Sequence, residues 1–270
     1  MLFSALALAV GVLAYGLAGA RLHEGSQHQD GALRSRAWWL GTVLQGLGFG
    51  ATLLARHSLP LLIVQACSTA GLGVTAALQH LSGVRRLGRR EVAALGALLV
   101  GLALLSTTTI GGPAVPIRTS HVWLMAGCAA LATALLAARP SPAVLGLASG
   151  LGFSFGAIGA RLVIGDAAHP LWRFWELPLA TWVVGLLTGV GIVLGQAHLT
   201  RGLARGRATT VLGPMYLTET LLPAIVGLTL LGELPRPHTG PMAGLGLAVT
   251  LGACAVLLRE DGHPPYDPQI

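Results

Sequence analysis

The sequence predicts an all-α, polytopic membrane protein of about nine transmembrane helices, arranged as two inverted-topology repeats of four and five helices. Three observations lead to this fold class: an apolar composition, a series of apolar segments of membrane length, and an internal match between the two halves. The 270 residues are 53% hydrophobic and only 10% charged, whereas about 25% of the residues in a soluble domain are charged. Because so few charged residues cannot cover a water-facing surface, we expect lipid to surround much of the chain.

Nine apolar segments follow one another, each near the length of about 20 residues that a membrane-spanning helix needs. They lie near 2–20, 37–55, 59–80, 92–110, 120–138, 142–165, 177–197, 208–231 and 240–258. The first segment ends in Ala18, Gly19 and Ala20, which resembles a signal-peptide cleavage site. No basic residue precedes it, however, and it is longer than a usual signal-peptide core, so we expect it to be retained as the first span.

The distribution of arginine predicts the orientation of the chain in the cell membrane. Of the 17 Arg residues, twelve lie in the connections after spans 1, 3, 5 and 7 or in the C-terminal tail. Four lie in the other connections: Arg56, Arg118, Arg173 and Arg236. Because cytoplasmic loops are enriched in basic residues, we expect the N-terminus outside and the C-terminus in the cytoplasm. The net charge of +7 is thereby interpreted as topology, and we expect no nucleic-acid partner.

The two halves of the chain resemble each other in three consecutive features. Segment 59–80 aligns without gaps with segment 212–233, and upstream of them Trp39 and Gly41 match Trp182 and Gly185. Downstream, small residues recur at a spacing of four: Ala93, Ala97 and Gly101 in the fourth span, and Gly240, Gly244, Ala248 and Gly252 in the ninth. We therefore expect a four-helix repeat over 1–110, an inverted five-helix repeat over 120–260, and a short cytoplasmic tail over 261–270.

Residues 207–260 carry a resemblance to a known family. Leu231, Gly232 and Glu233 form a Leu-Gly-Glu exit, Pro214 and Pro223 lie in the preceding helix, and Gly244 and Gly252 lie in a glycine-rich last helix. This segment resembles the end of an EamA-like repeat of the drug/metabolite transporter superfamily, whose members typically have ten spans. The nine-span layout is similar to the magnesium-transporter-like branch. The resemblance implies secondary transport but no particular substrate.

Glu219 is the leading candidate for a functional residue. It lies about eleven residues into its apolar segment, where a charged side chain costs about 2.5–3.5 kcal/mol on insertion scales. Pro214 and Pro223 interrupt the backbone hydrogen bonding around it and free carbonyl groups near residues 210 and 219. Transporters bind substrates at such sites near mid-membrane, so we predict that Glu219 carries a proton or binds a cationic group. The alternative is a neutral contact between helices.

Further polar residues complete the predicted substrate or proton site. They are Gln45, Gln65, Tyr216 and Thr218. Gln65 lies one position from the repeat equivalent of Glu219, as expected for a pseudo-symmetric site, although a glutamine can equally serve only to join helices. Arg161 lies near the outer end of its span. It is predicted to extend toward the interface or to pair with Asp166, whereas an ion pair with Glu219 would have to close an offset of about 10 Å.

The motifs of several other function classes are missing from the sequence. The three cysteines lie in apolar segments without Cys-x-x-Cys spacing, and the histidines lack metal-ligand spacing, so no metal is predicted. Neither a Walker motif nor a His-Glu-x-x-His motif is present, so we predict neither an enzyme nor a cofactor.

These observations together favour a secondary transporter that moves a small solute by alternating access, with proton coupling through Glu219. The nine-span layout favours a divalent cation such as magnesium, but a single carboxylate favours an organic solute. A non-transporting membrane scaffold or partner-binding subunit is the alternative from another class. The expected partners are the substrate and the lipid bilayer, and a homodimer is left open.

Overall fold

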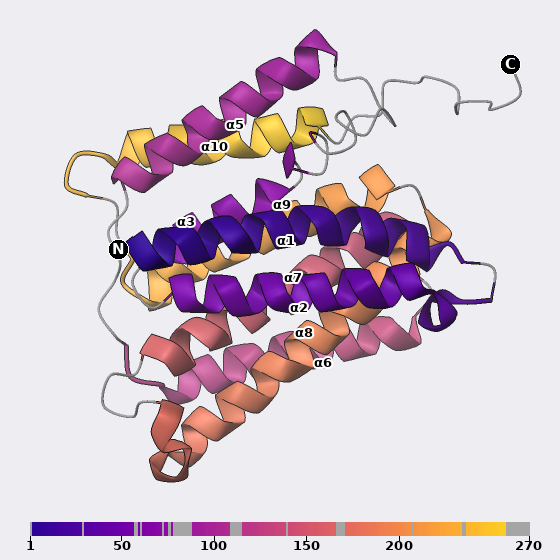
Figure 1. The fold of residues 1–270 in the computed structure, drawn as a ribbon. Helices are drawn as coiled ribbons and strands as arrows, with labels where there is room; N and C mark the ends of the chain where they lie inside the picture. Colours follow the sequence, from indigo (N-terminus) through magenta and orange to yellow (C-terminus); the bar gives the residue numbers. More distant parts are fainter. Residues whose placement is uncertain are drawn as a thin grey trace, which may run out of the picture.

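The computed structural model describes residues 2–28, 30–56, 59, 61–71, 73–74, 77, 88–108, 115–138, 140–165, 171–206, 208–233 and 236–257. All regular structure within these residues is helical, which confirms the predicted all-α class (Figure 1). The α-helices are α1 (Leu2–Ser26), α2 (Arg36–Ala55), α3 (Leu61–Thr69), α5 (Arg89–Thr108), α6 (Thr119–Ala137), α7 (Pro142–Gly165), α8 (Leu179–Arg205), α9 (Ala208–Leu230) and α10 (Gly240–Leu257). Two 3-10 helices, η1 (Ala32–Arg34) and η2 (Leu171–Glu176), lie in connections.

Several helices have the length and composition of membrane spans. Among the described residues, five meet both criteria: Leu2–Ser26, Thr119–Ala137, Pro142–Ile164, Leu179–Arg205 and Thr210–Leu230. Helices α5 and α10 contribute the shorter apolar stretches Val92–Leu105 and Gly240–Val256. The predicted membrane character is thus confirmed, whereas the other four of the nine predicted spans stay predictions. The tail at 261–270 lies outside the described residues.

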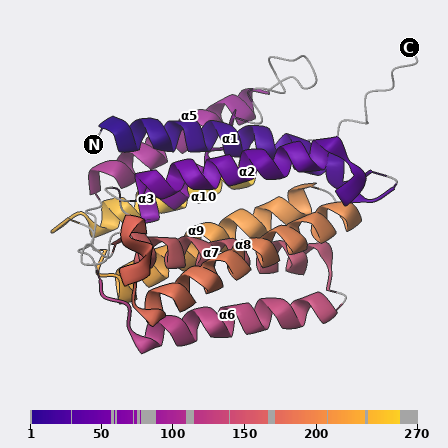
Figure 2. The same ribbon diagram turned by 60° about the horizontal axis from the view of Figure 1, so that its bottom comes forward.

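The helices pack in side-by-side pairs. Helix α1 packs along α2, α7 packs along both α8 and α9, and α5 packs along α10 (Figures 1 and 2). The short helix α3 contacts α9 and α1 and so joins the two halves of the chain. Helix α6 lies against α7 and α8 at the edge of the bundle, as Figure 2 shows. The α1–α2 pair and the α7–α8–α9 group therefore face each other across the middle of the protein.

Glycines allow α7 to pack closely on two neighbours at once. Gly146 and Gly150 lie against α9, where an added Cβ atom would collide with the backbone carbonyl oxygens of Val211 and Met215. Gly152 lies on a different face, against the backbone of α8. Close backbone approach of this kind is how small residues bring membrane helices together. Both neighbours of α7 are consequently held at short range.

The predicted small-residue rows of α5 and α10 differ in whether they lie at a helix contact. Gly101 of α5 lies directly against Gly246 and Thr250 of α10, as its place in a small-residue row suggests. The predicted row of α10 does not make this contact, because Gly240, Gly244, Ala248 and Gly252 are exposed. Both faces of α10 carry small residues, and the face with Gly246 and Thr250 is the one that packs. The prediction for α10 therefore chose the wrong face.

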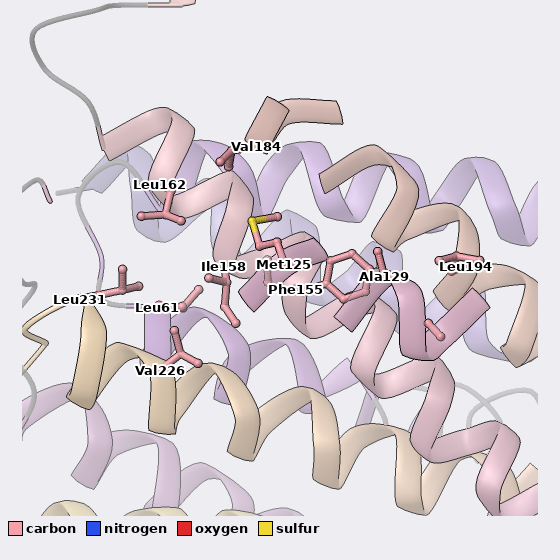
Figure 3. Packing of buried hydrophobic residues seen from close by; sticks show 12 residues of the cluster. Leu61, Met125, Ala129, Phe155, Ile158, Leu162, Val184, Leu194, Val226 and Leu231 are labelled. Carbon is pink, nitrogen blue, oxygen red and sulfur yellow. The ribbon is translucent and has the colours of Figure 1, made fainter. Parts of the chain in front are cut away.

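The largest buried apolar cluster lies in the C-terminal half. It joins Met125 of α6, Phe155 and Ile158 of α7, and Val226 of α9, and Leu61 of α3 extends it to the N-terminal half (Figure 3). A second cluster lies between α1 and α2 on one side and α8 and α9 on the other. The two halves are thus joined by apolar contacts as well as by the chain.

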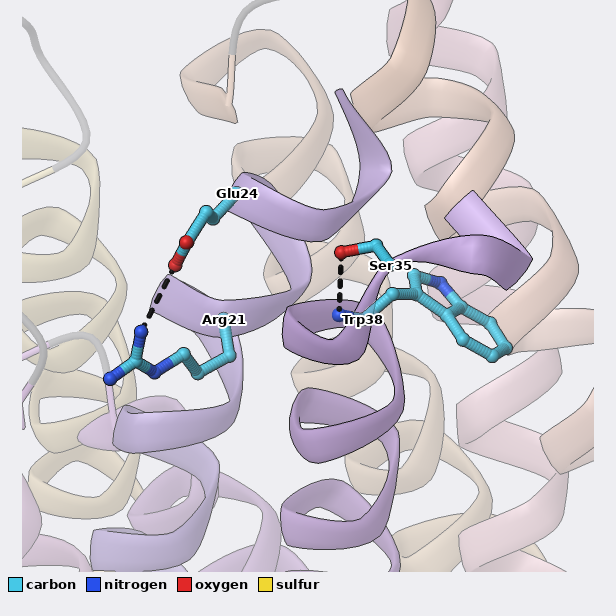
Figure 4. Close-up of polar contacts among 4 residues, drawn as sticks. All are labelled: Arg21, Glu24, Ser35 and Trp38. Atoms are coloured by element: carbon cyan, nitrogen blue, oxygen red, sulfur yellow. Dashed lines mark hydrogen bonds and ion pairs between the residues drawn. The ribbon is translucent and has the colours of Figure 1, made fainter. Parts of the chain in front are cut away.

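Polar contacts fix the end of the bundle where α2 begins. The Ser35 hydroxyl accepts a hydrogen bond from the backbone N–H of Trp38 at 3.4 Å and caps α2, while Arg21 and Glu24 form an exposed ion pair at 3.1 Å (Figure 4). The indole N–H of Trp38 donates to the Thr200 hydroxyl of α8 at 3.0 Å. This last bond joins the two helix groups directly.

Candidate functional site

A cavity of about 180 Å³ lies between the two facing groups of helices. We call it the central cavity. Its polar lining comes from both halves of the chain: Tyr15, Thr42, Gln45, Arg56, Gln196 and Glu219. Its apolar lining includes Phe49, Phe153 and Ile192. A smaller cavity of about 30 Å³ shares Tyr15, Gln45 and Glu219 with it, so these three side chains lie where the two spaces meet.

The central cavity brings together two residues of the predicted site, Glu219 and Gln45. Glu219 is presented by α9 and Gln45 by α2, so they come from different halves of the chain. The side-chain oxygen of Gln45 is buried and has no hydrogen-bond partner among the described residues. Buried polar atoms are nearly always paired, so an unpaired one at a cavity wall indicates a place for a ligand or a water molecule. Two of the residues predicted for a polar site therefore line one cavity, and their function stays a prediction.

Arg56 is the residue of the central cavity that sequence reasoning missed. It follows α2 directly and was counted among the arginines of the connections, yet it is only 2% exposed. Its Nη2 donates to Oε1 of Gln65 at 3.1 Å, and its guanidinium lies 5.1 Å from the centre of the Phe49 ring. Its Nε and Nη1 have no hydrogen-bond partner among the described residues. The C-terminal end of a helix favours a cation at this position, which explains in part why the arginine turns inward.

Gln65 connects Arg56 to the helix that carries Glu219. Its Nε2 donates to the backbone carbonyl oxygen of Glu219 at 3.1 Å. That carbonyl is free because Pro223, four residues later, has no N–H to donate, so the predicted release of a carbonyl near residue 219 is confirmed. Helix α9 nevertheless continues through both prolines, from Ala208 to Leu230. The interruption is confined to single hydrogen bonds and does not break the helix.

The other predicted residues of α9 lie at different distances from the central cavity. Tyr216 lines the smaller cavity beside Glu219. Thr218 lines neither space: its hydroxyl donates to the carbonyl of Pro214 at 2.9 Å, and its own carbonyl accepts from Ser154 at 3.1 Å. Thr218 therefore serves the contact between α9 and α7. The structure does not bring it to the predicted site.

Tyr15 is the second residue that the sequence prediction did not include. It lies in the interior of α1 and lines both cavities. The signal was present in the sequence, because tyrosines of membrane helices gather at the interfaces and their hydroxyl groups usually find a partner when buried. A tyrosine well inside the first apolar segment is unusual for that reason.

Arg161 forms an ion pair with a residue that the sequence prediction did not consider, Glu233. Its Nε lies 3.2 Å from Oε1 of Glu233, and the second carboxylate oxygen of Glu233 accepts the backbone N–H of Leu61 at 2.9 Å. The ion pair with Glu219 is therefore not formed, and Asp166 lies outside the described residues. Gly232, at a φ of 63°, ends α9 in the left-handed conformation and directs Glu233 toward the start of α3. The Leu-Gly-Glu exit thus joins α7, α9 and α3.

Two further observations bear on the site: the side-chain groups that could hold a metal ion and the comparisons with known proteins. Within the described part of the chain, no group of three or more His, Cys, Asp and Glu side chains could hold a metal ion. Comparisons with protein-family models, with curated proteins and with solved structures found no match. We therefore infer the function from the site itself.

Proposed function

We propose that the protein is a secondary transporter of the cell membrane, which moves a small solute by alternating access around the central cavity. One observation carries this proposal: Glu219 and Arg56, two ionisable side chains from different halves of the chain, line the same cavity between apolar helices. Charged residues inside membrane proteins generally face a cavity or a partner and mark pathways for substrates, ions or protons. As part of this proposal, we assign the chain to the EamA-like drug/metabolite transporters on the resemblance of residues 207–260.

The hydrogen bonding of Arg56 favours transport over a scaffold role. A scaffold has no use for a guanidinium that is 2% exposed and has two nitrogens without partners among the described residues. A buried charge that is only partly paired is destabilising, and such groups are retained where they serve a function. The nearby ion pair of Arg161 and Glu233 shows how this chain satisfies a buried arginine when the role is structural.

The pairing of the helices supports the inverted-repeat interpretation. In this interpretation α1, α2, α3 and α5 correspond to α7, α8, α9 and α10. Helix α1 packs on α2 as α7 packs on α8, and counterparts meet each other, α3 against α9 and α5 against α10. Contacts between counterparts are typical of two copies related by a two-fold axis. Helix α6, without a counterpart, is then the additional helix of the five-helix half.

The composition of the central cavity favours an organic solute over a divalent cation. Magnesium prefers carboxylate and water oxygens, and Glu219 is the one carboxylate among the residues that line the cavity. The guanidinium of Arg56 lies in the same space and repels a cation. We retain the predicted orientation, with the N-terminus outside and the C-terminus in the cytoplasm, as part of this proposal. Proton coupling through Glu219 is part of it as well.

Flux in proteoliposomes tests the proposal. The wild-type protein is reconstituted and supplied with labelled neutral amino acids, monocarboxylates, amines and hexoses. Entry of Mg²⁺ is measured with a dye inside the liposomes. We expect at least one organic solute to enter faster than into protein-free liposomes, and Glu219→Gln to abolish this uptake. Glu24→Gln, which alters an exposed carboxylate of α1, is the matched control and is expected to transport as the wild type does. If no solute enters, the transport proposal is wrong. If a solute enters but Glu219→Gln transports it normally, the role assigned to Glu219 is wrong.

A further inference from the structure

Resting on the proposed transport function, we propose that the central cavity binds a small zwitterion, whose carboxylate is bound by Arg56 and whose amine is bound by Glu219. Both side chains line the same cavity, but they form no hydrogen bond or ion pair with each other. Neither charge therefore has a direct partner of opposite sign among the described residues. A ligand with one group of each sign would satisfy both.

The spare hydrogen-bond donors of Arg56 define one end of the binding site. Only Nη2 is engaged, by Gln65, whereas the buried Nε and Nη1 are without partners among the described residues. Arginine N–H groups bind carboxylates strongly because charge-assisted hydrogen bonds are shorter and stronger than neutral ones. A carboxylate of the ligand is the group that this end lacks.

The second end of the binding site consists of acceptors. The carboxylate of Glu219 makes no hydrogen bond within the described residues, and the buried Gln45 oxygen is also unpaired there. An ammonium group has three donors and no acceptor, so it matches such a set of oxygens. The phenol of Tyr15 lies at the same end, where the two cavities meet.

Charge balance favours a zwitterion over a singly charged solute. The cavity offers one cationic and one anionic side chain, so it is electrically neutral as a whole. An amine alone would leave Arg56 unpaired in a buried space, and a carboxylate alone would leave Glu219 unpaired. Leaving one member of a buried set of charges without a partner is strongly unfavourable.

The size and apolar lining limit the rest of the ligand. A cavity of about 150 Å³ in a protein core is known to hold a benzene molecule, so the 180 Å³ here suits a solute of about six to ten non-hydrogen atoms. Phe49, Phe153 and Ile192 contribute apolar walls. A short aliphatic side chain fits these walls, and sugars or nucleotides are too large and too polar.

Binding to the purified full-length protein in detergent tests this inference. The probes are valine with its two singly charged analogues, isobutylamine and isovalerate, and 4-aminobutyrate with propylamine and butyrate, since the two sets differ in the separation of their charges. Dissociation constants come from calorimetry or from ligand-induced shifts in melting temperature. We expect at least one zwitterion to bind about tenfold or more tightly than both of its analogues, which corresponds to about 1.4 kcal/mol.

Substitutions then assign the two ends. Arg56→Gln is expected to remove the advantage of the zwitterion over the amine, and Glu219→Gln the advantage over the carboxylate. Arg21→Gln and Glu24→Gln, at the exposed pair of α1, are expected to change neither. Should Arg56→Gln fail to fold, Arg56→Lys keeps the positive charge and is expected to retain the preference for the zwitterion over the amine.

The outcomes separate this inference from the transport proposal. If an amine or a carboxylate binds as tightly as the zwitterion, or if none of the probes binds, the zwitterion inference is overturned. Glu219-dependent flux of another solute would in that case leave transport standing. If a zwitterion binds with the expected preference but neither it nor any other solute is carried in proteoliposomes, the transport proposal fails instead.

Discussion

The ion pair between Arg161 and Glu233 allows the energetic effect of burial to be measured within one chain. Its side chains are 12% and 4% exposed, and their N–O distance is 3.2 Å. The pair of Arg21 and Glu24 has nearly the same distance, 3.1 Å, but its side chains are 51% and 62% exposed. Both pairs join an arginine to a glutamate at a similar distance, but Arg21 and Glu24 are exposed and lie three residues apart on one helix. The exposed pair therefore serves as a reference with little burial.

We expect Glu233→Ala to lower the free energy of unfolding by about 3–5 kcal/mol, because it removes the carboxylate that pairs with Arg161 at a mostly buried position. The N–H of Leu61 also loses its acceptor, which costs about 1–3 kcal/mol where no other partner is available and is included in that range. Removing both charges with Arg161→Ala and Glu233→Ala should be milder than the sum of the single substitutions. The coupling free energy from this double-mutant cycle is therefore expected to exceed about 1.5 kcal/mol.

The assay is reversible unfolding in mixed detergent and lipid micelles, followed by the helical circular dichroism signal. The same cycle at Arg21 and Glu24 is expected to give a coupling below about 1 kcal/mol, as exposed pairs do. Equal coupling in the two cycles would refute the reasoning, since burial would then have no influence on the strength of the pair.

Three further predictions concern packing and hydrogen bonds, and each is checked by the same unfolding measurement. Gly150→Ala is expected to destabilise the protein by about 1–3 kcal/mol, because the added methyl group collides with α9. Gly244→Ala, on the exposed face of α10, should be neutral or stabilising by up to about 1 kcal/mol. Equal effects of the two substitutions would contradict the close packing of α7 on α9. Gln65→Leu is expected to cost about 2 kcal/mol of stability, since Arg56 and the carbonyl of Glu219 both lose a hydrogen-bond partner. Gln65→Glu should cost less. If Gln65→Leu has no effect on stability, Gln65 does not connect Arg56 to α9 as described. Trp38→Phe should cost about 1 kcal/mol through loss of the bond to Thr200. It should cost more than Trp39→Phe, which loses only an exposed bond to the carbonyl of Leu33, and the reverse order would argue against the bond between α2 and α8.

Residues in the interior of apolar segments were the predictable part of the site. Glu219 and Gln45 stand out because a polar side chain within a membrane span needs a reason, and both line the central cavity. The freed carbonyl of Glu219 was also predictable, because the effect of Pro223 is local. The all-α class and the membrane character follow from composition and segment length in the same direct way.

Residues just outside the apolar segments were not predictable in this way. Arg56 follows α2, and an arginine at the end of a segment normally belongs to a connection. Its inward position depends on Gln65 and Phe49, and only the packing of α2 and α3 brings these together. The partner of Arg161 is likewise 72 residues away in the chain, at a turn set by Gly232.

The sequence pattern also could not show which face of a helix packs against its neighbour. On α10, glycines and other small residues occur on two faces at a spacing of four, and both rows suit a close contact. The position of α5 selects the face with Gly246 and leaves Gly244 exposed. A periodic pattern indicates that a helix can pack closely, but the neighbour decides where.

Access to the central cavity from both sides of the membrane is the most direct test of alternating access. After the natural cysteines Cys67, Cys128 and Cys254 are replaced by alanine, a single cysteine is introduced at Ile192, which lines the cavity and is only partly buried. A membrane-impermeant thiol reagent is then applied to either face of oriented proteoliposomes. We predict that Ile192→Cys reacts from both faces, whereas Ala132→Cys, fully buried in the apolar cluster around α6, reacts from neither. Reaction of Ile192→Cys from one face only, or from none, would contradict the proposed mechanism.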